Sequence, residues 1–261
     1  MSFYPILSAP GCEGWVGLSN FPPNNWEVKS RRSQFINVTW ISNGIWKTKN
    51  IGILPDGACA TIKARDVSHF VPNNVLGLIS LTRSVPPEES LLLPMLDVGQ
   101  TTVPAWRATL GLASKSAKTS FQGELDPFSP QGTLLTFGPF IQFGLEIKNF
   151  MILVNLEKSV IERKAELEIF DADNLSFKGS FTIRNNALNL IPLDKFNFKP
   201  SNLPVCICRD MAAIPLYFSS TIDGSYLSLE HTHPPGSLVV HGRRWESQKL
   251  LKNHWFSKLL R

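Results

Sequence analysis

An alternation of polar and apolar side chains with a period of two residues constrains the fold of this chain more than any other feature. Every second residue is apolar in KAELEIF (164–170), and a second alternating run covers residues 177–184 after the turn DADN (171–174). Because successive side chains of an extended strand point to opposite faces, such runs predict strands with one apolar and one polar face. Together with ALNLIPL (187–193), which follows another turn, they predict a three-stranded antiparallel meander.

Strand and turn signals recur along most of the chain. β-Branched and aromatic residues are concentrated in QFINVTWI (34–41), ACATIKA (58–64) alternates, and NNVLGLISLT (73–82) is typical of a buried strand. The Asp-Gly dipeptide at 223–224 predicts a hairpin between two further runs. Helix signals are scarce before the C-terminal segment, because proline or glycine interrupts nearly every candidate. We therefore predict an all-β fold, either one large antiparallel β-sandwich or two abutting β regions, with a C-terminal amphipathic helix.

Three regions are predicted along the chain: an N-terminal β-rich region over residues 1–100, an antiparallel β-sandwich region over 101–242 and a basic helix over 243–261. The first boundary follows linker-like segments at 84–90 and 98–104, which contain proline or small polar residues. The formal net charge is +5, and the predicted helix alone holds six basic side chains and one acidic side chain. The rest of the chain is therefore neutral, which argues against a nucleic-acid-binding protein.

The C-terminal segment has the pattern of an amphipathic helix, with Trp255 and Leu259 among the residues of its apolar side. Lys249 and Lys252 interrupt that side. Three roles remain open for it: a helix that closes one edge or end of the β body, a peripheral contact with an anionic membrane, and a docking helix for a partner. A membrane span is not expected, because glycine and proline break the longest uncharged run.

Composition indicates a folded protein of a reducing compartment. Aromatic residues make up 10% of the chain and charged residues only 18%, which is the opposite of a disordered chain. Four cysteines without a recognisable secretory signal predict free thiols and a cytoplasmic location. Cys206 and Cys208 share one strand face, and we interpret them as small buried side chains. The sequence contains no nucleophile elbow, phosphate-binding loop or dinucleotide fingerprint.

Three of the five histidines lie in LEHTHPPGSLVVHG (229–242). In an extended strand His231 and His233 point to the same side, as the two ligands of a His-x-His zinc site do. His241 is the nearest third ligand, and a hairpin through the Pro-Pro-Gly turn places it diagonal to His231, roughly 7–8 Å away. These residues predict a site for a divalent metal such as zinc, and ordinary strand histidines with no cofactor are the alternative.

Other catalytic patterns are incomplete in this chain. The string His-Thr-His-Pro is similar to the zinc motif of JAMM isopeptidases, but Gly242 and Trp245 stand where that family needs serine and aspartate. Glu124 and Asp126 share one side of an extended segment and are a weaker candidate for paired catalytic carboxylates. A metal-dependent hydrolase or isomerase that uses the His-x-His pair is therefore the alternative function, and no family supports it.

Tryptophans gather near the N-terminus, at Trp15, Trp26, Trp40 and Trp46. Tryptophan and tyrosine on the loops of a β-sandwich often bind sugars or proteins, although core packing is the commoner fate of tryptophan. We take Trp26 and Trp46 as the candidate ligand contacts. The first function predicted from the sequence is a non-catalytic β-sandwich protein that recognises a glycan or a protein partner.

Overall fold

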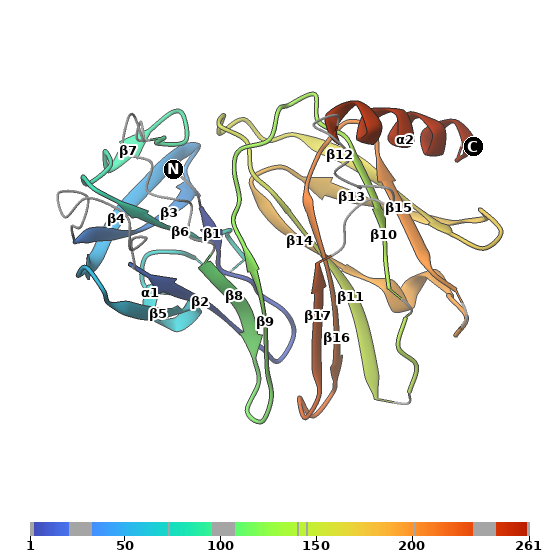
Figure 1. The fold of residues 1–261 in the computed structure, drawn as a ribbon, viewed down its shortest axis with the longest axis horizontal. Coiled ribbons are helices and arrows are strands. Elements are labelled where there is room, and N and C mark those ends of the chain that lie inside the picture. Colours follow the sequence, from blue (N-terminus) through green and yellow to red (C-terminus); the bar gives the residue numbers. More distant parts are fainter. Residues whose placement is uncertain are drawn as a thin grey trace. The chain divides into compact units, whose positions relative to one another are not determined.

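The computed structural model of this protein describes residues 3–20, 33–72, 74–95, 108–139, 141–144, 146–200, 202–231 and 244–259, without the side chains of residues 244–248. Its elements are almost all antiparallel strands, which form four sheets (Figure 1). The predicted all-β, sandwich-like fold with a C-terminal helix is confirmed. Within the described ranges, no helix is long and apolar enough to cross a membrane.

The strands form two compact units, and neither unit is one continuous stretch of chain. Unit 1 contains Met1–Phe128, Leu156–Glu162 and Asn186–Leu188. Unit 2 contains the remaining segments, which are Ser129–Asn155, Arg163–Asn185 and Asn189–Arg261. The first boundary along the chain follows Phe128, whereas the sequence patterns placed one after residue 100. That expectation rested on two linker-like segments, of which 84–90 lies within unit 1 and 98–104 lies outside the described residues.

Unit 1 is a β-sandwich of two antiparallel sheets. Its elements are β1 (Tyr4–Pro5), β2 (Glu13–Ser19), β3 (Gln34–Ser42), β4 (Ile45–Leu54), β5 (Cys59–Lys63), α1 (Ala64–Val67), β6 (Leu78–Thr82), β7 (Glu89–Ser90), β8 (Ala108–Ala113) and β9 (Lys118–Gly123). One sheet has the order β1-β6-β3-β4-β7 and the other the order β5-β2-β8-β9. Val38 of β3 from the first sheet and Val16 of β2 from the second are buried in the same core cluster.

The hairpin of β3 and β4 shows how local residues specify these strands. The two strands pair along their whole length, and only Asn43 and Gly44 separate them. Both residues have left-handed backbone, with φ of 52° and 73°. Asparagine and glycine tolerate this conformation, and two such residues match the twist of paired strands.

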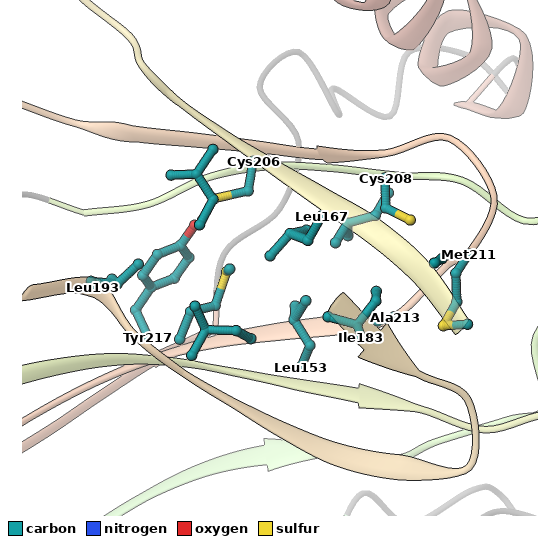
Figure 2. Close-up of a cluster of buried hydrophobic side chains, with 14 of the residues drawn as sticks. Leu153, Leu167, Ile183, Leu193, Cys206, Cys208, Met211, Ala213 and Tyr217 are labelled. Atoms are coloured by element: carbon teal, nitrogen blue, oxygen red, sulfur yellow. The ribbon is translucent and has the colours of Figure 1, made fainter. Parts of the chain in front are cut away.

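Unit 2 also consists of two antiparallel sheets around one core. Its elements are β10 (Leu134–Phe137), β11 (Ile147–Asn155), β12 (Lys164–Asp171), β13 (Phe177–Arg184), β14 (Ala187–Pro192, whose first two residues count with unit 1), η2 (Leu193–Phe196), β15 (Pro204–Cys208), β16 (Ile214–Thr221), β17 (Leu227–His231) and α2 (Arg244–Lys258). The sheets have the orders β10-β15-β12-β13 and β14-β11-β16-β17. Leu153 of β11 and Leu167 of β12 meet in the core between them (Figure 2).

The predicted meander is correct for two strands and wrong for the third. β12 and β13 pair as expected, but β14 joins the other sheet, next to β11. The Asn189 side chain explains the difference. Its Oδ1 accepts a hydrogen bond from Arg184 N–H (2.8 Å), and its Nδ2 donates to the carbonyl oxygens of Arg184 (2.9 Å) and Leu153 (3.3 Å). This side chain satisfies the end of β13 and ties β14 to β11.

Helix α2 lies on the outer face of the sheet β10-β15-β12-β13 (Figure 1). Leu259, just after the helix, is 1% exposed and packs against Val205 and Ile207 of β15. The Trp255 ring meets the Phe137 ring edge-on, with 4.8 Å between the ring centres. The helix therefore packs on the β body, as the first of its three predicted roles requires, but it covers a sheet face and not an edge or end.

Two cations hold the helix in place. Lys252 interrupts the apolar side in the sequence, but its Nζ donates a hydrogen bond to the Thr133 carbonyl oxygen (2.8 Å), and burial lowers its pKa. Arg209 donates to the carbonyl oxygens of Phe256 (3.3 Å) and Leu259 (3.1 Å). Carbonyl groups in the last turn of a helix lack partners within the helix, so this contact caps α2 with a positive charge.

Candidate functional site

The outer face of the sheet β5-β2-β8-β9 in unit 1 carries the strongest candidate site. Along β2, Val16 and Leu18 point into the core, so Trp15 points away from it. Trp15 pairs with Gly111 of β8 on one side and with Lys63 of β5 on the other. A tryptophan therefore stands in the middle of this sheet, on the face opposite the core.

The other residues of this outer face are small or hydrophilic. By cross-strand register they are Glu13, Gly17, Ser19, Cys59, Thr61, Lys63, Thr109, Gly111, Ala113, Lys118, Ser120 and Gln122. Thr61, Ser120 and Gln122 are exposed to solvent. Trp15 is the single large apolar side chain in this set of described residues. We call this surface the Trp15 face.

Glycine on the neighbouring strand lets the indole ring lie against the sheet. A Cβ atom at Gly111 would stand 2.6 and 2.7 Å from two ring atoms of Trp15. A Cβ atom at Gly17 would stand 3.4 Å from a third ring atom. The ring therefore rests on the backbone of β8, a position that only glycine at residue 111 permits without a clash.

One cation lies over the ring. Lys118 Nζ lies 4.0 Å from the ring centre of Trp15, and because the sheet covers one side of the ring, this cation–π contact is on the outward side. Neither Lys118 nor Lys63 forms an ion pair with a carboxylate of the described residues. The one acid of the face, Glu13, pairs with Arg65, with 3.5 Å between Oε1 and Nε.

The indole N–H of Trp15 is buried and has no hydrogen-bond acceptor within the described part of the chain. A buried donor left in this state costs roughly 1–3 kcal/mol, and such groups are few in native structures. The flat position of the ring is therefore kept at the expense of one hydrogen bond, which is unusual for a residue that only fills space.

Of the two tryptophans predicted to bind a ligand, Trp46 lies in the described residues, away from the Trp15 face. Trp46 of β4 is 1% exposed, and its Nε1–H donates to the Lys158 carbonyl oxygen (3.0 Å), so it anchors the segment 156–162 within unit 1. Its ring offers almost no surface to a ligand. Trp40 belongs to the core of unit 1, and Trp26 lies outside the described residues.

Of the three predicted metal ligands, His231 alone lies in the described residues. It ends β17, opposite Leu216, and shares a strand face with Leu229 as its position in the sequence predicts. His233 and His241 lie outside the described residues. Among the residues that are described, no group of three or more His, Cys, Asp or Glu could hold a metal ion. The zinc site therefore stays a prediction.

Cys206 and Cys208 are buried on one face of β15, as predicted (Figure 2). The Tyr217 hydroxyl points at Cys206 and donates to its Sγ (3.8 Å). Burial raises the pKa of Cys206 to about 12. A thiol with this pKa stays protonated near neutral pH, and a protonated thiol is a poor nucleophile and metal ligand. The pair packs the core of unit 2.

Glu124 and Asp126 flank Leu125, whose backbone pairs with Phe3. They lie near Tyr4, a core residue of unit 1. Burial, followed by the charges of Glu124 and Asp126, raises the pKa of Tyr4 well above its usual value. The phenol therefore stays protonated, and a catalytic role for the two carboxylates stays a prediction.

Sequence reasoning alone does not identify Lys63, Gly111 and Lys118 as site residues, since they meet Trp15 only through strand pairing. The run EGWVGLS (13–19) does contain one usable signal, because its tryptophan falls on the polar side of an alternating strand.

Comparison with protein-family models, with curated proteins and with solved structures finds no match to this chain.

Proposed function

We propose that this protein is a non-catalytic, glycan-binding β-sandwich protein and that the Trp15 face holds the sugar. The observation that carries the proposal is the indole ring laid flat on Gly111, amid small and polar side chains. Ligand sites combine an apolar surface with a few well-placed polar groups. A sugar ring suits such a site, because it has a face of C–H groups and a rim of hydroxyl groups.

The side chains around the ring match that rim. Thr61, Thr109 and Ser120 carry hydroxyl groups, and Gln122 carries an amide, so each can both donate and accept hydrogen bonds. They belong to β5, β8 and β9, and therefore lie on both sides of the strand that carries Trp15. Groups on paired strands are held more rigidly than groups on loops, which lowers the entropic cost of binding.

A protein partner would call for a different surface. Stable protein interfaces bury about 1,200–2,000 Å² and have a core enriched in aromatic and apolar residues. Trp15 is the one large apolar residue in the set that forms the Trp15 face. Of the two partners considered, the glycan is therefore the better supported.

We also propose that this protein binds sugar without a cofactor and is located in the cytoplasm. Stacking and hydrogen bonding need no cofactor, so we propose none for sugar binding. All four cysteines are free thiols, which supports a reducing, cytoplasmic environment.

A glycan array probed with the full-length protein and with Trp15→Ala tests the proposal. A central tryptophan contributes about 2 kcal/mol or more to a binding site, so we expect the variant to lose at least about 30-fold in affinity. Its melting temperature should change little, because Trp15 lies outside the core. Tyr226→Ala, which removes an exposed aromatic residue of unit 2, should bind like the wild type. Unchanged binding by Trp15→Ala, or no binding of any glycan by the wild type, would contradict the proposal.

A further inference from the structure

We infer that the ligand of the Trp15 face is an acidic glycan, whose negative group is bound by Lys118. This inference rests on the proposed function and specifies the class of sugar. It is carried by the position of the Lys118 ammonium group, which lies on the ring itself.

The charge of the Trp15 face is unbalanced. Lys63 and Lys118 come from β5 and β9, the two outer strands of the sheet, and the Lys118 ammonium group lies over the ring. The Asp66 carboxylate accepts a hydrogen bond from the Lys63 backbone N–H (2.8 Å), and Arg65 pairs with Glu13, but no carboxylate of the described residues pairs with Lys118. One uncompensated positive charge, that of Lys118, therefore lies where a sugar would stack, and it favours a negatively charged ligand.

Lys118 also occupies that place. Its Nζ is 4.0 Å from the ring centre on the outward side, so a sugar can stack on Trp15 only after the ammonium group has moved. A neutral sugar would remove the cation–π contact and give the ammonium nothing stronger in return. A carboxylate or sulfate at the edge of the sugar offers an ion pair in exchange. Lysine has a long flexible stem, and Lys118 is exposed, so this exchange needs no change in the backbone.

The exchange makes Lys118 a determinant of specificity as well as a source of attraction. While it rests on the ring, it opposes neutral sugars, and once displaced it attracts acidic ones. Removal of its charge should therefore change the affinities for the two kinds of sugar in opposite directions. General attraction between a basic surface and an anion would not produce this pattern.

Calorimetric titration of the full-length protein with matched pairs of oligosaccharides tests the inference. The pairs are oligogalacturonate and galacto-oligosaccharide, oligoglucuronate and cello-oligosaccharide, and oligomannuronate and manno-oligosaccharide, with a sulfated galactan oligosaccharide as a further probe. We expect at least one acidic probe to bind tenfold or more tightly than its neutral counterpart. A tighter uronate identifies carboxylate as the recognised group, and a tighter sulfated probe identifies sulfate.

Lys118→Met is the decisive variant, because methionine keeps much of the side chain and removes the charge. We expect it to bind the acidic probe about two- to fivefold more weakly, as for the loss of one exposed ion pair. It should bind the neutral probe about two- to fivefold more tightly, because no cation–π contact has to be broken. The preference for acid should thus fall about tenfold. Lys115 is an exposed lysine in the turn between β8 and β9, and Lys115→Met should keep the wild-type preference for the acidic probe.

The outcomes separate this inference from the proposed function. Equal binding of acidic and neutral probes, or a preference that Lys118→Met leaves unchanged, overturns the inference and leaves sugar binding intact. Polyglutamate bound as tightly as the best acidic sugar also overturns it, because charge alone would then be recognised. If no oligosaccharide binds, the proposed function fails and the inference fails with it.

Discussion

Replacement of Gly111 by alanine tests whether the backbone of β8 supports the Trp15 ring. The added methyl group would stand 2.6 Å from Cε2 and 2.7 Å from Cζ2 of Trp15, and closer still to the Thr119 carbonyl oxygen. Carbon atoms pack best at about 3.5–4.0 Å, so the ring would have to move by roughly 1 Å. The clash with Thr119 involves the backbone, so a change of side-chain conformation alone cannot relieve it.

Overpacking of this kind costs about 1–3 kcal/mol in the free energy of unfolding. Denaturant slopes are about 1–3 kcal/mol per molar urea, so we expect the unfolding midpoint of Gly111→Ala to fall by about 1 M. Urea titration followed by circular dichroism and tryptophan fluorescence measures this shift. Displacement of the ring should also weaken sugar binding in the calorimetric titration.

Gly17→Ala is the matched control, because this glycine also lies under the ring. Its added methyl group would make ordinary contacts, 3.4 Å from Trp15 and 3.6 Å from Thr109. Gly17 and Gly111 both lack the left-handed backbone that favours glycine, so alanine strains neither for that reason. We expect Gly17→Ala to change stability by less than about 0.5 kcal/mol. Equal stability and equal sugar affinity in the two variants would refute the proposed support of the ring.

Two further predictions concern unit 2. Leu259→Ala should lower the free energy of unfolding by about 2–5 kcal/mol, because Leu259, just after α2, is 1% exposed. Leu250→Ala, at a residue of α2 that is 70% exposed, should change it by less than about 0.5 kcal/mol. Calorimetry of both variants checks this, and equal melting temperatures would contradict the docking of α2. The pKa of Cys206 is about 12 in the folded protein and about 8.5 in an unfolded chain, so its contribution to stability is full below pH 8.5 and is lost as the pH rises toward 12. Cys206→Val should therefore flatten the fall in stability between about pH 9 and pH 11, measured by urea unfolding at each pH, and parallel pH profiles would argue against a buried neutral thiol.

The fold class could be predicted because its signals are local. Alternation and turn residues lie within a few positions of one another, and they correctly predicted β12, β13 and the turn between β16 and β17. The partner of β14 could not be predicted in this way. It depends on Asn189, whose side chain bonds both to the neighbouring Arg184 and to Leu153, a residue distant in sequence.

The candidate site was less accessible to sequence reasoning than the fold. The strand position of Trp15 follows from alternation, but its contacts with Gly111 and Lys118 depend on which strands pair and in what register. The same limit applies to α2. Lys252 appears in the sequence as a defect of the apolar side, yet it reaches the Thr133 carbonyl oxygen, 119 positions earlier in the chain. Charge pattern alone cannot distinguish a misplaced lysine from one with a distant acceptor.

The discontinuous composition of unit 1 also governs how this protein can be made. Trp46 finds its acceptor at Lys158, 112 positions later in the chain, and the last segment of the unit ends at Leu188. Unit 1 therefore cannot be completed until most of the chain has left the ribosome, and contacts of such long range slow folding. A fragment cut after Phe128 would lack Lys158 and leave the Trp46 indole without its acceptor. Neither unit can be exchanged as a single contiguous block, because segments of the two units alternate along the chain. An insertion or recombination within one unit therefore has to preserve the segments of the other.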